Sequence, residues 1–278
     1  VHLVSGLRDL VPLAHRLRRD GVSARSTYDL QGKVLSHLLC LLMGGSAGRY
    51  TKRSLSESWH AWRGRYPLPS ANPDPVWRRY LATVQADTVE QPDARLIITD
   101  NYLRECREFL TALDPALASS YVAFHPGASH PGKRFTPENL QALVSQLHGT
   151  LLFIGDQPDP PAPQMRSAQI IDGRGRIPLR LLPGTLRLSQ GLIGTDSGPM
   201  HLARATGTPL VACFFQTDPC LGFAPIPGNL QYLISRPLPC KPCSLHGQRT
   251  VCPVGTWACR HIDWVAEAAA FKSLLYKS

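Results

Sequence analysis

The segment from 192 to 215, LIGTDSGPMHLARATGTPLVACFF, most constrains what this chain can fold into. Its pattern predicts a strand, a tight polar turn at 195–198, a short helix from Pro199 and a second strand. Proline suits the first helical position because its missing N–H would be unbonded there, and Gly207 can end the helix in a left-handed conformation. A strand, a helix and another strand form a parallel βαβ unit, so the segment predicts an α/β fold.

The polar turn and the start of this helix predict an anion-binding site, because the N–H groups and dipole of a helix N-terminus favour negative charge. Gly198 would let the backbone approach a diphosphate closely. Asp196 could orient a sugar hydroxyl or, like Ser197, cap the helix. His201 could donate to a phosphate oxygen or simply pack. The candidate residues of this loop are Thr195, Asp196, Ser197, Gly198 and His201.

A second loop, HPGASHPGKRF at 125–135, has the same character. Small residues at 127–129 predict a tight turn after a strand. Lys133 and Arg134 follow at a distance that can bring them back over an anion, and Ser129 can add a hydroxyl donor. The glycine spacing does not match a P-loop, and an ordinary polar loop is the alternative. Two such loops on one parallel sheet predict a shared site at its carboxyl edge.

The length of 278 residues suggests two domains. Residues 1–112 are expected to form a first α/β domain, 113–262 a second, and 263–278 a C-terminal helix. In the second domain we expect strands at 121–125, 151–154 and 170–171, a helix over 136–148, a weak helix over 179–186 broken at Pro183, and a helix over 264–275. In the first we expect helices over 11–19, 36–43, 55–62, 76–86 and 102–113 and a strand at 96–99.

The net charge of +10 is divided evenly between residues 1–112 and the remainder. This balance suits anionic small molecules or an anionic membrane surface, although a generally basic protein is the alternative. The chain has no basic tail and no docking motif for nucleic acid, so we expect no nucleic-acid partner. No apolar run approaches ~18 residues, which predicts no transmembrane helix. With no visible signal peptide, we expect a cytoplasmic protein.

Four cysteines cluster near the C-terminal end, at Cys240, Cys243, Cys252 and Cys259. The C-x2-C pair has good spacing for a metal, but the other spacings are irregular for a zinc ribbon. A structural zinc, a pair of disulfides and free thiols all remain open. No activating partner is evident, so we expect no catalytic thiol.

These motifs occur in an order that resembles glycosyltransferase family 9, the ADP-heptose lipopolysaccharide heptosyltransferases. The residues that carry the resemblance are HPGASHPGKRF, IGTDSGPMHLARATGTPLVACFFQTDP and the CKPC…CPVGTWAC tail, and YDLQGK at 28–33 is similar to a first-domain motif of the family. The resemblance spans nearly all of 28–262. It implies the GT-B arrangement, in which two Rossmann-like domains face each other across a cleft and the last helix, from about Trp264, crosses back to the first domain.

The resemblance also implies an activity, the transfer of heptose or a similar sugar from a nucleotide-diphosphate donor such as ADP-heptose to a lipopolysaccharide core acceptor at the inner membrane face. Transfer would invert the anomeric carbon and need no metal. A carboxylate would deprotonate the acceptor hydroxyl, and cationic and helix-end groups would stabilise the departing diphosphate. By this resemblance Ser129 and Lys133 would bind the diphosphate, while Asp196, Ser197, Gly198 and His201 would hold diphosphate and sugar from the opposite loop.

In one respect the sequence departs from the family pattern. The N-terminal strand and Gly-Asp turn that supply the catalytic base are not found in these 278 residues. We therefore expect the first domain to be incomplete and the base to be an Asp upstream of Val1. Asp9, in GLRDL, is similar to that turn but lies too close to YDLQGK. The alternative is a nucleotide-sugar-binding module without turnover.

Overall fold

The computed structural model describes residues 6–50, 75–84, 95–157, 159–164 and 168–276. The chain divides into two compact units, of which the first contains the described residues up to 84 and the second those from 95 onward. In these ranges no helix has the length and apolar character needed to cross a lipid bilayer. The helix predicted over 55–62 lies outside the described residues.

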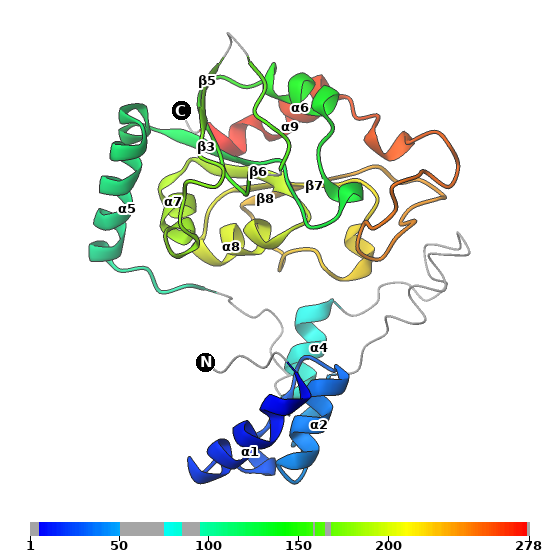
Figure 1. The fold of residues 1–278 in the computed structure, drawn as a ribbon. Coiled ribbons are helices and arrows are strands. Elements are labelled where there is room, and N and C mark those ends of the chain that lie inside the picture. The colour runs from blue at the N-terminus through cyan, green and yellow to red at the C-terminus, as the bar shows by residue number, and fades with distance from the viewer. Residues whose placement is uncertain (1–5, 51–74, 85–94, 158, 165–167, 277–278) are drawn as a thin grey trace. The chain divides into compact units, whose positions relative to one another are not determined.

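The first unit is small and mainly helical (Figure 1). Its helices are α1 (Leu10–Arg19), α2 (Val34–Leu42) and α4 (Val76–Thr83), with 3-10 turns η1 (Leu7–Asp9) and η2 (Ala24–Ser26). The helices predicted near these positions are confirmed, although α4 ends earlier than expected. The strands β1 (Tyr28–Asp29) and β2 (Gly48–Arg49) pair in parallel. Among the described residues of the first unit, this short parallel pair is the only β-structure, and the other elements are helical.

The second unit is built on a six-stranded parallel sheet with the order β5-β4-β3-β6-β7-β8. The strands are β3 (Tyr121–His125), β4 (Gly149–Phe153), β5 (Ala168–Asp172), β6 (Gly191–Thr195), β7 (Leu210–Phe214) and β8 (Gln231–Ser235). The chain runs outward from β3 to β5, returns to the centre and runs outward again from β6 to β8. The order therefore reverses between β3 and β6, the point at which open α/β sheets bind ligands outside the carboxyl ends of their strands.

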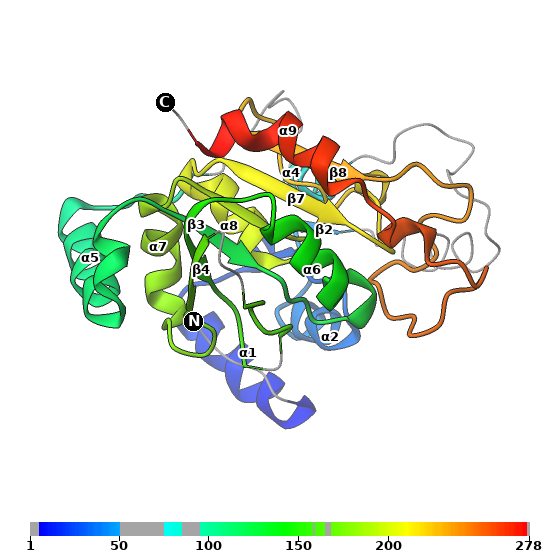
Figure 2. The same ribbon diagram turned by 90° about the horizontal axis from the view of Figure 1, so that it is seen from above.

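Helices cover both faces of this sheet (Figures 1 and 2). One face carries α6 (Pro137–Val144) and α9 (Trp264–Leu275). The other carries α7 (Leu182–Leu188) and α8 (Gly198–Thr206), with α5 (Asp100–Leu113) packed against α7. The remaining short turns are η3 (Pro115–Ala118), η4 (Pro131–Lys133), η5 (Leu179–Leu181), η6 (Pro219–Leu221) and η7 (Ala258–Arg260). The predicted α/β fold with a parallel sheet is confirmed.

Strand β3 shows how the sequence produces these layers. All five of its residues are buried, as expected for a parallel strand covered on both faces. Val122 and Phe124 pack in the core beneath α6 and α9, while Tyr121 and Ala123 pack in the opposite core. Full burial of a side chain such as Phe124 contributes roughly 1.5–3 kcal/mol. Side chains that alternate between two apolar cores fix the register of this central strand.

Several boundaries differ from the sequence predictions. Pro183 does not break a helix, because it lies in the first turn of α7, where no backbone N–H is needed. No strand forms at 96–99; instead Thr99 caps α5 by accepting the N–H of Tyr102 at 3.3 Å. Helix α6 ends at Val144 rather than near 148, and strand β8 was not foreseen.

The predicted domain boundaries, after residues 112 and 262, can be compared with the positions of helices α5 and α9. Helix α5 groups with the second unit, which begins before the predicted boundary at 112. Helix α9 begins at Trp264, as predicted, and packs against α6 and strands β6 to β8. The domain ranges 1–112, 113–262 and 263–278, and the crossing of the last helix to the first domain, stay predictions.

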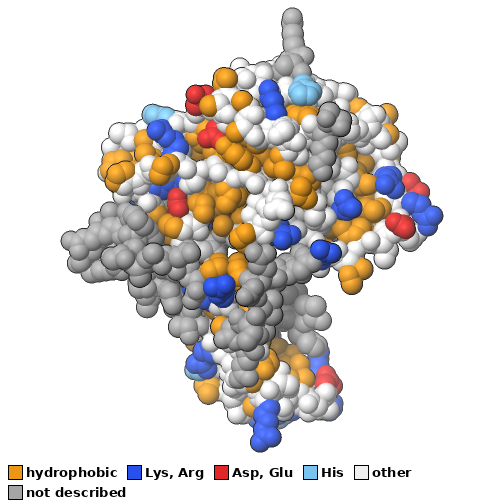
Figure 3. Space-filling model, turned by 180° about the vertical axis from the view of Figure 1, so that it is seen from behind, with side chains coloured by type: hydrophobic (Ala, Val, Ile, Leu, Met, Phe, Trp, Pro, Cys, Tyr) orange, Lys and Arg blue, Asp and Glu red, His pale blue; other side chains and the backbone are white. Residues whose placement is uncertain are grey.

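One face of the molecule shows how its basic side chains are distributed. On the face drawn in Figure 3, Lys and Arg side chains lie dispersed among apolar and neutral ones. A nucleic-acid-binding surface is expected to have a continuous basic stripe. The Lys and Arg side chains on this face do not form one.

Candidate functional site

The two predicted anion-binding loops meet where the strand order reverses. Loop 126–134 follows β3 and loop 196–198 follows β6, and these strands are neighbours in the sheet. The fully buried hydroxyl of Thr195 joins the loops, since it donates to the carbonyl of Gly127 and lies 3.1 Å from Ser197 Oγ. With no accessible surface, the Thr195 side chain holds the two loops together from behind.

An ion pair crosses between the loops. Lys133 Nζ lies 2.8 Å from Asp196 Oδ2, and the two side chains are only 15% and 5% exposed. The structure thus brings together the cation of one loop and the carboxylate of the other. A compact ammonium in this position suits a phosphate.

Backbone contacts from distant segments hold the turn that carries Lys133. The N–H of Gly132 donates to Gly247 O at 2.9 Å, and the N–H of Gln216 donates to Gly132 O at 3.2 Å. Gly247 has a φ of +75°, and a Cβ built on it would lie 2.7 Å from Lys133 Cγ. Only glycine therefore satisfies both the backbone conformation and the close approach. Residues 244–251, between Cys243 and Cys252, therefore form a wall behind Lys133, and we call them the wall segment.

At the start of α8, Pro199 has no N–H and the N–H of Met200 donates to the Ser197 carbonyl at 3.1 Å, so Gly198 presents the first N–H that a ligand can reach. The helix begins at Gly198, one residue earlier than predicted, and Ser197 is its N-cap residue but makes no side-chain cap. The predicted capping by Ser197 or Asp196 is wrong, because Ser197 Oγ faces His125 and Thr195 and the Asp196 carboxylate pairs with Lys133. The C-terminal prediction is confirmed by Gly207, whose φ is +69°.

A pocket of ≈ 280 Å³ lies directly in front of the start of α8. Gly198 is exposed there, and a Cβ built on it would meet no atom within 4 Å. The lining residues are His125, Ala128, Ser129, Arg134, Asp156, Asp159, Ser197, Gly198 and Pro199. Free helix amides facing an open polar pocket can receive an anion.

His201 lies on the first turn of α8 and is exposed. Crowding by surrounding protein lowers its pKa, Lys133 acts in the same direction, and Asp196 opposes them. The structure therefore gathers all seven predicted binding residues, from Ser129 and Lys133 to Thr195 through His201, at one edge of the sheet.

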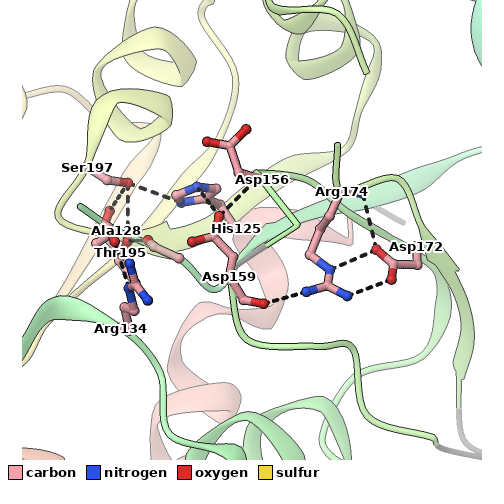
Figure 4. Close-up of polar contacts among 10 residues, drawn as sticks. His125, Ala128, Arg134, Asp156, Asp159, Asp172, Arg174, Thr195 and Ser197 are labelled. Atoms are coloured by element: carbon pink, nitrogen blue, oxygen red, sulfur yellow. Dashed lines mark hydrogen bonds and ion pairs between the residues drawn. The ribbon is translucent and has the colours of Figure 1, made fainter. Parts of the chain in front are cut away.

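Two further residues of the pocket were not foreseen, His125 and Asp159 (Figure 4). His125 ends β3 and is buried, with Nδ1 3.1 Å from Ser197 Oγ and Nε2 3.8 Å from Asp159 Oδ2. Burial lowers the pKa of His125, while Asp159 and Asp156 act to raise it. His125 could have been predicted as a site residue, because it ends a predicted strand just before the small-residue turn. Asp159 lies in a Pro-rich loop, and no sequence pattern there indicated a role in the site.

The Asp159 carboxylate is fitted closely into the loop. A Cβ on Gly127 would lie 1.9 Å from Asp159 Cγ, so the glycine makes room for the acid. The N–H of Asp156 donates to Asp159 Oδ2 at 2.9 Å. Arg174 donates to the Asp159 carbonyl and forms two bonds to Asp172, of 2.9 and 2.8 Å. Asp159 is therefore fixed from both its backbone and its side chain.

The four clustered cysteines line one small cavity of ≈ 10 Å³ behind the wall segment, and all are free thiols. The N–H of Trp257 donates to Cys252 Sγ at 3.3 Å, and backbone N–H groups lower the pKa of Cys252. Burial raises the pKa of Cys243 to about 11. Within the described ranges no three Cys, His, Asp or Glu side chains are grouped so that they could hold a metal ion. The positions of Cys240, Cys243, Cys252 and Cys259 thus give no support to a structural zinc, which was one of the three alternatives left open by the sequence.

The YDLQGK motif has a structural explanation within the first unit. Asp29 Oδ1 accepts the N–H groups of Gln31 and Gly32 at 3.2 and 2.9 Å. Ser36 Oγ accepts the N–H of Lys33 at 3.0 Å and donates to the Lys33 carbonyl at 2.9 Å. These polar side chains stabilise the turn between β1 and α2.

A lysine, a helix N-terminus and hydroxyl groups that converge at the switch point of a parallel α/β sheet form an arrangement suited to a phosphorylated ligand. The chain belongs to glycosyltransferase family 9 (heptosyltransferase), whose family model matches residues 12–252. It is therefore a glycosyltransferase.

Solved structures agree on the fold. A glycosyl transferase family 9 protein from Veillonella parvula is 17% identical, with a TM-score of 0.69 and coverage of 98% of this chain and 79% of that one. The ADP-heptose lipopolysaccharide heptosyltransferase II of E. coli is 18% identical, with a TM-score of 0.59 and coverage of 94% and 82%. These likenesses identify the fold as that of GT-B glycosyltransferases of this family. No curated protein matches the chain in sequence.

Proposed function

We propose that this glycosyltransferase transfers a heptose, or a closely similar sugar, from ADP-heptose to a lipopolysaccharide core acceptor. The family supports sugar transfer, and the fold is shared with an enzyme named for ADP-heptose and lipopolysaccharide. The observation that carries the proposal is the Lys133–Asp196 pair beside the N-terminus of α8. A diphosphate is the ligand group whose charge matches a buried lysine and a helix N-terminus together.

The same geometry supports an inverting reaction. The acceptor hydroxyl loses its proton to a carboxylate and attacks the anomeric carbon as the bond from that carbon to the diphosphate oxygen breaks. Lys133 and the α8 amides then stabilise the charge that develops on the departing nucleoside diphosphate. Because these groups supply positive charge at the leaving group, we propose that the transfer uses no metal.

We propose that the base is a carboxylate other than Asp196 and Asp29. Asp196 is held by Lys133, and Asp29 accepts two backbone N–H groups in its own turn. This engagement of both acids also favours the second candidate, a module that binds the nucleotide sugar without turnover. We further propose that the protein works at the cytoplasmic membrane face, where the lipid-linked acceptor is accessible.

The four thiols have no part in this chemistry. Burial raises the pKa values of two of them, Cys243 and Cys259. The cavity that the four thiols line is also lined by Gln216, whose N–H donates to the Gly132 carbonyl in the turn of Lys133. The wall segment contacts that turn through Gly247. We propose that the thiols support the wall as packing groups.

Isothermal titration with ADP and ADP-heptose tests the proposal, with GDP-mannose as the mismatched donor. We expect ADP to bind and Lys133→Ala to weaken it. Incubation of ADP-heptose with a lipopolysaccharide core that lacks heptose should then yield a product heavier by one heptose, detected by mass spectrometry. Binding without transfer would favour the module, and no nucleotide binding at all would overturn both candidates.

A further inference from the structure

His125, Ser197 and Asp159 come from three segments and meet at the floor of the pocket (Figure 4). We propose that His125 couples donor binding to the uptake of one proton, and that the protonated ring turns Ser197 into a hydrogen-bond donor toward a phosphate oxygen of the donor. This inference rests on the proposed function, because it assigns the bound anion as a nucleoside diphosphate. It makes His125 a positioning residue, which acts on the ligand through Ser197.

The first step concerns the single proton of the Ser197 hydroxyl. Its acceptors in the structure are His125 Nδ1 at 3.1 Å and the Thr195 carbonyl at 3.2 Å. Asp159 lies 3.8 Å from the other ring nitrogen and favours a proton on Nε2 of the neutral ring. Nδ1 then accepts from Ser197, so the hydroxyl presents only lone pairs to the pocket. A phosphate oxygen placed there would be repelled.

Protonation of the ring reverses this arrangement. An imidazolium donates from both nitrogens, so Nδ1–H points to Ser197 Oγ while Nε2–H stays toward Asp159. The Ser197 proton is released from the ring and can be donated to a phosphate oxygen. The balance is one proton from solvent added at Nδ1, and no other covalent bond changes.

The charges around His125 set the direction of the linkage. Asp159 and Asp156, from the loop after β4, favour the charged ring, while its burial favours the neutral one. Arg134, from the loop after β3, lines the same pocket and donates to the Ala128 carbonyl at 2.7 Å. Lys133, from the loop after β3, and Asp196, just after β6, compensate each other as an ion pair.

Arg174, beyond β5, is compensated by Asp172 and contacts only the carbonyl of Asp159. In the free protein, burial therefore keeps His125 neutral near pH 7. A diphosphate bound within hydrogen-bond reach of Ser197 adds negative charge and raises the pKa of the ring. Since the pKa of His125 is higher in the complex than in the free protein, ADP should bind more tightly as the pH falls through the pKa of the complex. This gain in affinity should vanish by pH 8.

The experiment is titration calorimetry of ADP at pH 6.5 in three buffers that differ in ionisation enthalpy, with the intact protein. The test variant is His125→Asn, whose amide can contact Ser197 but cannot titrate. We expect the wild type to take up more protons on binding than the variant, and the difference between the two proteins cancels the titration of ADP itself. A rise of about one pKa unit in the complex makes ADP bind up to about tenfold more tightly at acid pH than at pH 8, and the variant should lack this gain.

Another histidine lies near the same ion pair and serves as a control. His246 interacts electrostatically with Lys133 and Asp196. His246→Asn should retain the wild-type excess of proton uptake, whatever its affinity. If the excess disappears in His246→Asn and persists in His125→Asn, the proposal is overturned.

The remaining outcomes separate this inference from the proposed function. Tight ADP binding with equal proton uptake by wild type and His125→Asn overturns the inference alone. No ADP binding by the wild type overturns the proposed function and the inference with it. If His125→Asn does not fold, NMR titration of the His125 ring in the wild type decides, and a pKa that stays the same or falls when ADP is added refutes the coupling.

Discussion

A methyl group added at Gly198 should leave the fold intact and still block the pocket. Gly198 opens α8 in a helical conformation, and a Cβ built on it meets no atom within 4 Å. Replacing glycine by alanine within a helix stabilises by about 0.5–1 kcal/mol, because the unfolded chain loses less freedom on folding. We therefore expect Gly198→Ala to unfold at the same temperature as the wild type or at one a few degrees higher.

Donor binding should change in the opposite direction. The added methyl occupies the space in front of the start of α8, where we propose that the diphosphate binds. A hydrogen bond to a charged group contributes about 1.5–3 kcal/mol, and losing one weakens ADP binding about 10- to 150-fold. An opposite change in stability and affinity is informative, because general damage to the fold would lower both.

Calorimetry gives the dissociation constant of ADP, and differential scanning fluorimetry gives the melting temperature. Gly6→Ala is the matched control, since a Cβ there also meets no atom within 4 Å. The control should bind ADP within about twofold of the wild type, a difference of ~0.4 kcal/mol. If Gly198→Ala bound ADP as tightly as Gly6→Ala does, the diphosphate could not lie against the start of α8.

Three further predictions concern the groups around the pocket. Lys133→Ala should weaken ADP binding by about 1–3 kcal/mol in calorimetry, and unchanged affinity would contradict its assignment. Gly247→Ala should lower the free energy of unfolding by about 1–2 kcal/mol in urea denaturation, because of its φ of +75°, and should also weaken ADP binding through the clash with Lys133. Arg174 lowers the pKa of Asp172, so the pair stabilises the fold above about pH 4 and loses this effect as the pH falls through the folded pKa. Because Asp172 is 45% exposed, Asp172→Asn should cost at most about 1 kcal/mol at neutral pH, and a melting-temperature difference that persisted at acid pH would refute the reasoning.

The parts of the fold that the sequence predicts well have local causes. The unit β6-α8-β7 was predictable because Pro199 and Gly207 mark where the helix begins and ends, and the flanking strands are continuous apolar runs. Pro183 misled because proline both breaks helices and favours their first turn, and only the tertiary packing of α7 decides between the two. Strand β8 was missed because, at the sheet edge, it is mostly half-buried and has no strong apolar pattern.

The site, like the fold, contains some residues that local sequence predicts and others that depend on tertiary packing. Lys133 and Asp196 could be brought together from sequence because each follows a recognisable strand, and the carboxyl ends of parallel strands share an edge. The contact between His125 and Ser197, 72 residues apart, follows from the same topology but needs side-chain directions that the sequence does not contain. Asp159 was out of reach, because its position depends on the room left by Gly127.

The contact between the wall segment and Lys133 has a different origin from the contact between the two loops. Strands β3 and β6 are hydrogen-bonded neighbours, ~4.8 Å apart, so their loops must meet whatever their sequences are. The segment around Gly247 instead follows β8 at the sheet edge and returns across the strand ends to contact Gly132. No hydrogen bond of the sheet requires this return; it is held by the hydrogen bond from Gly132 N–H to the Gly247 carbonyl and by Gln216 Nε2, which donates to the Arg249 carbonyl at 2.7 Å. Substitutions among its buried residues should therefore move Lys133 and lower donor affinity even where the parallel sheet stays intact.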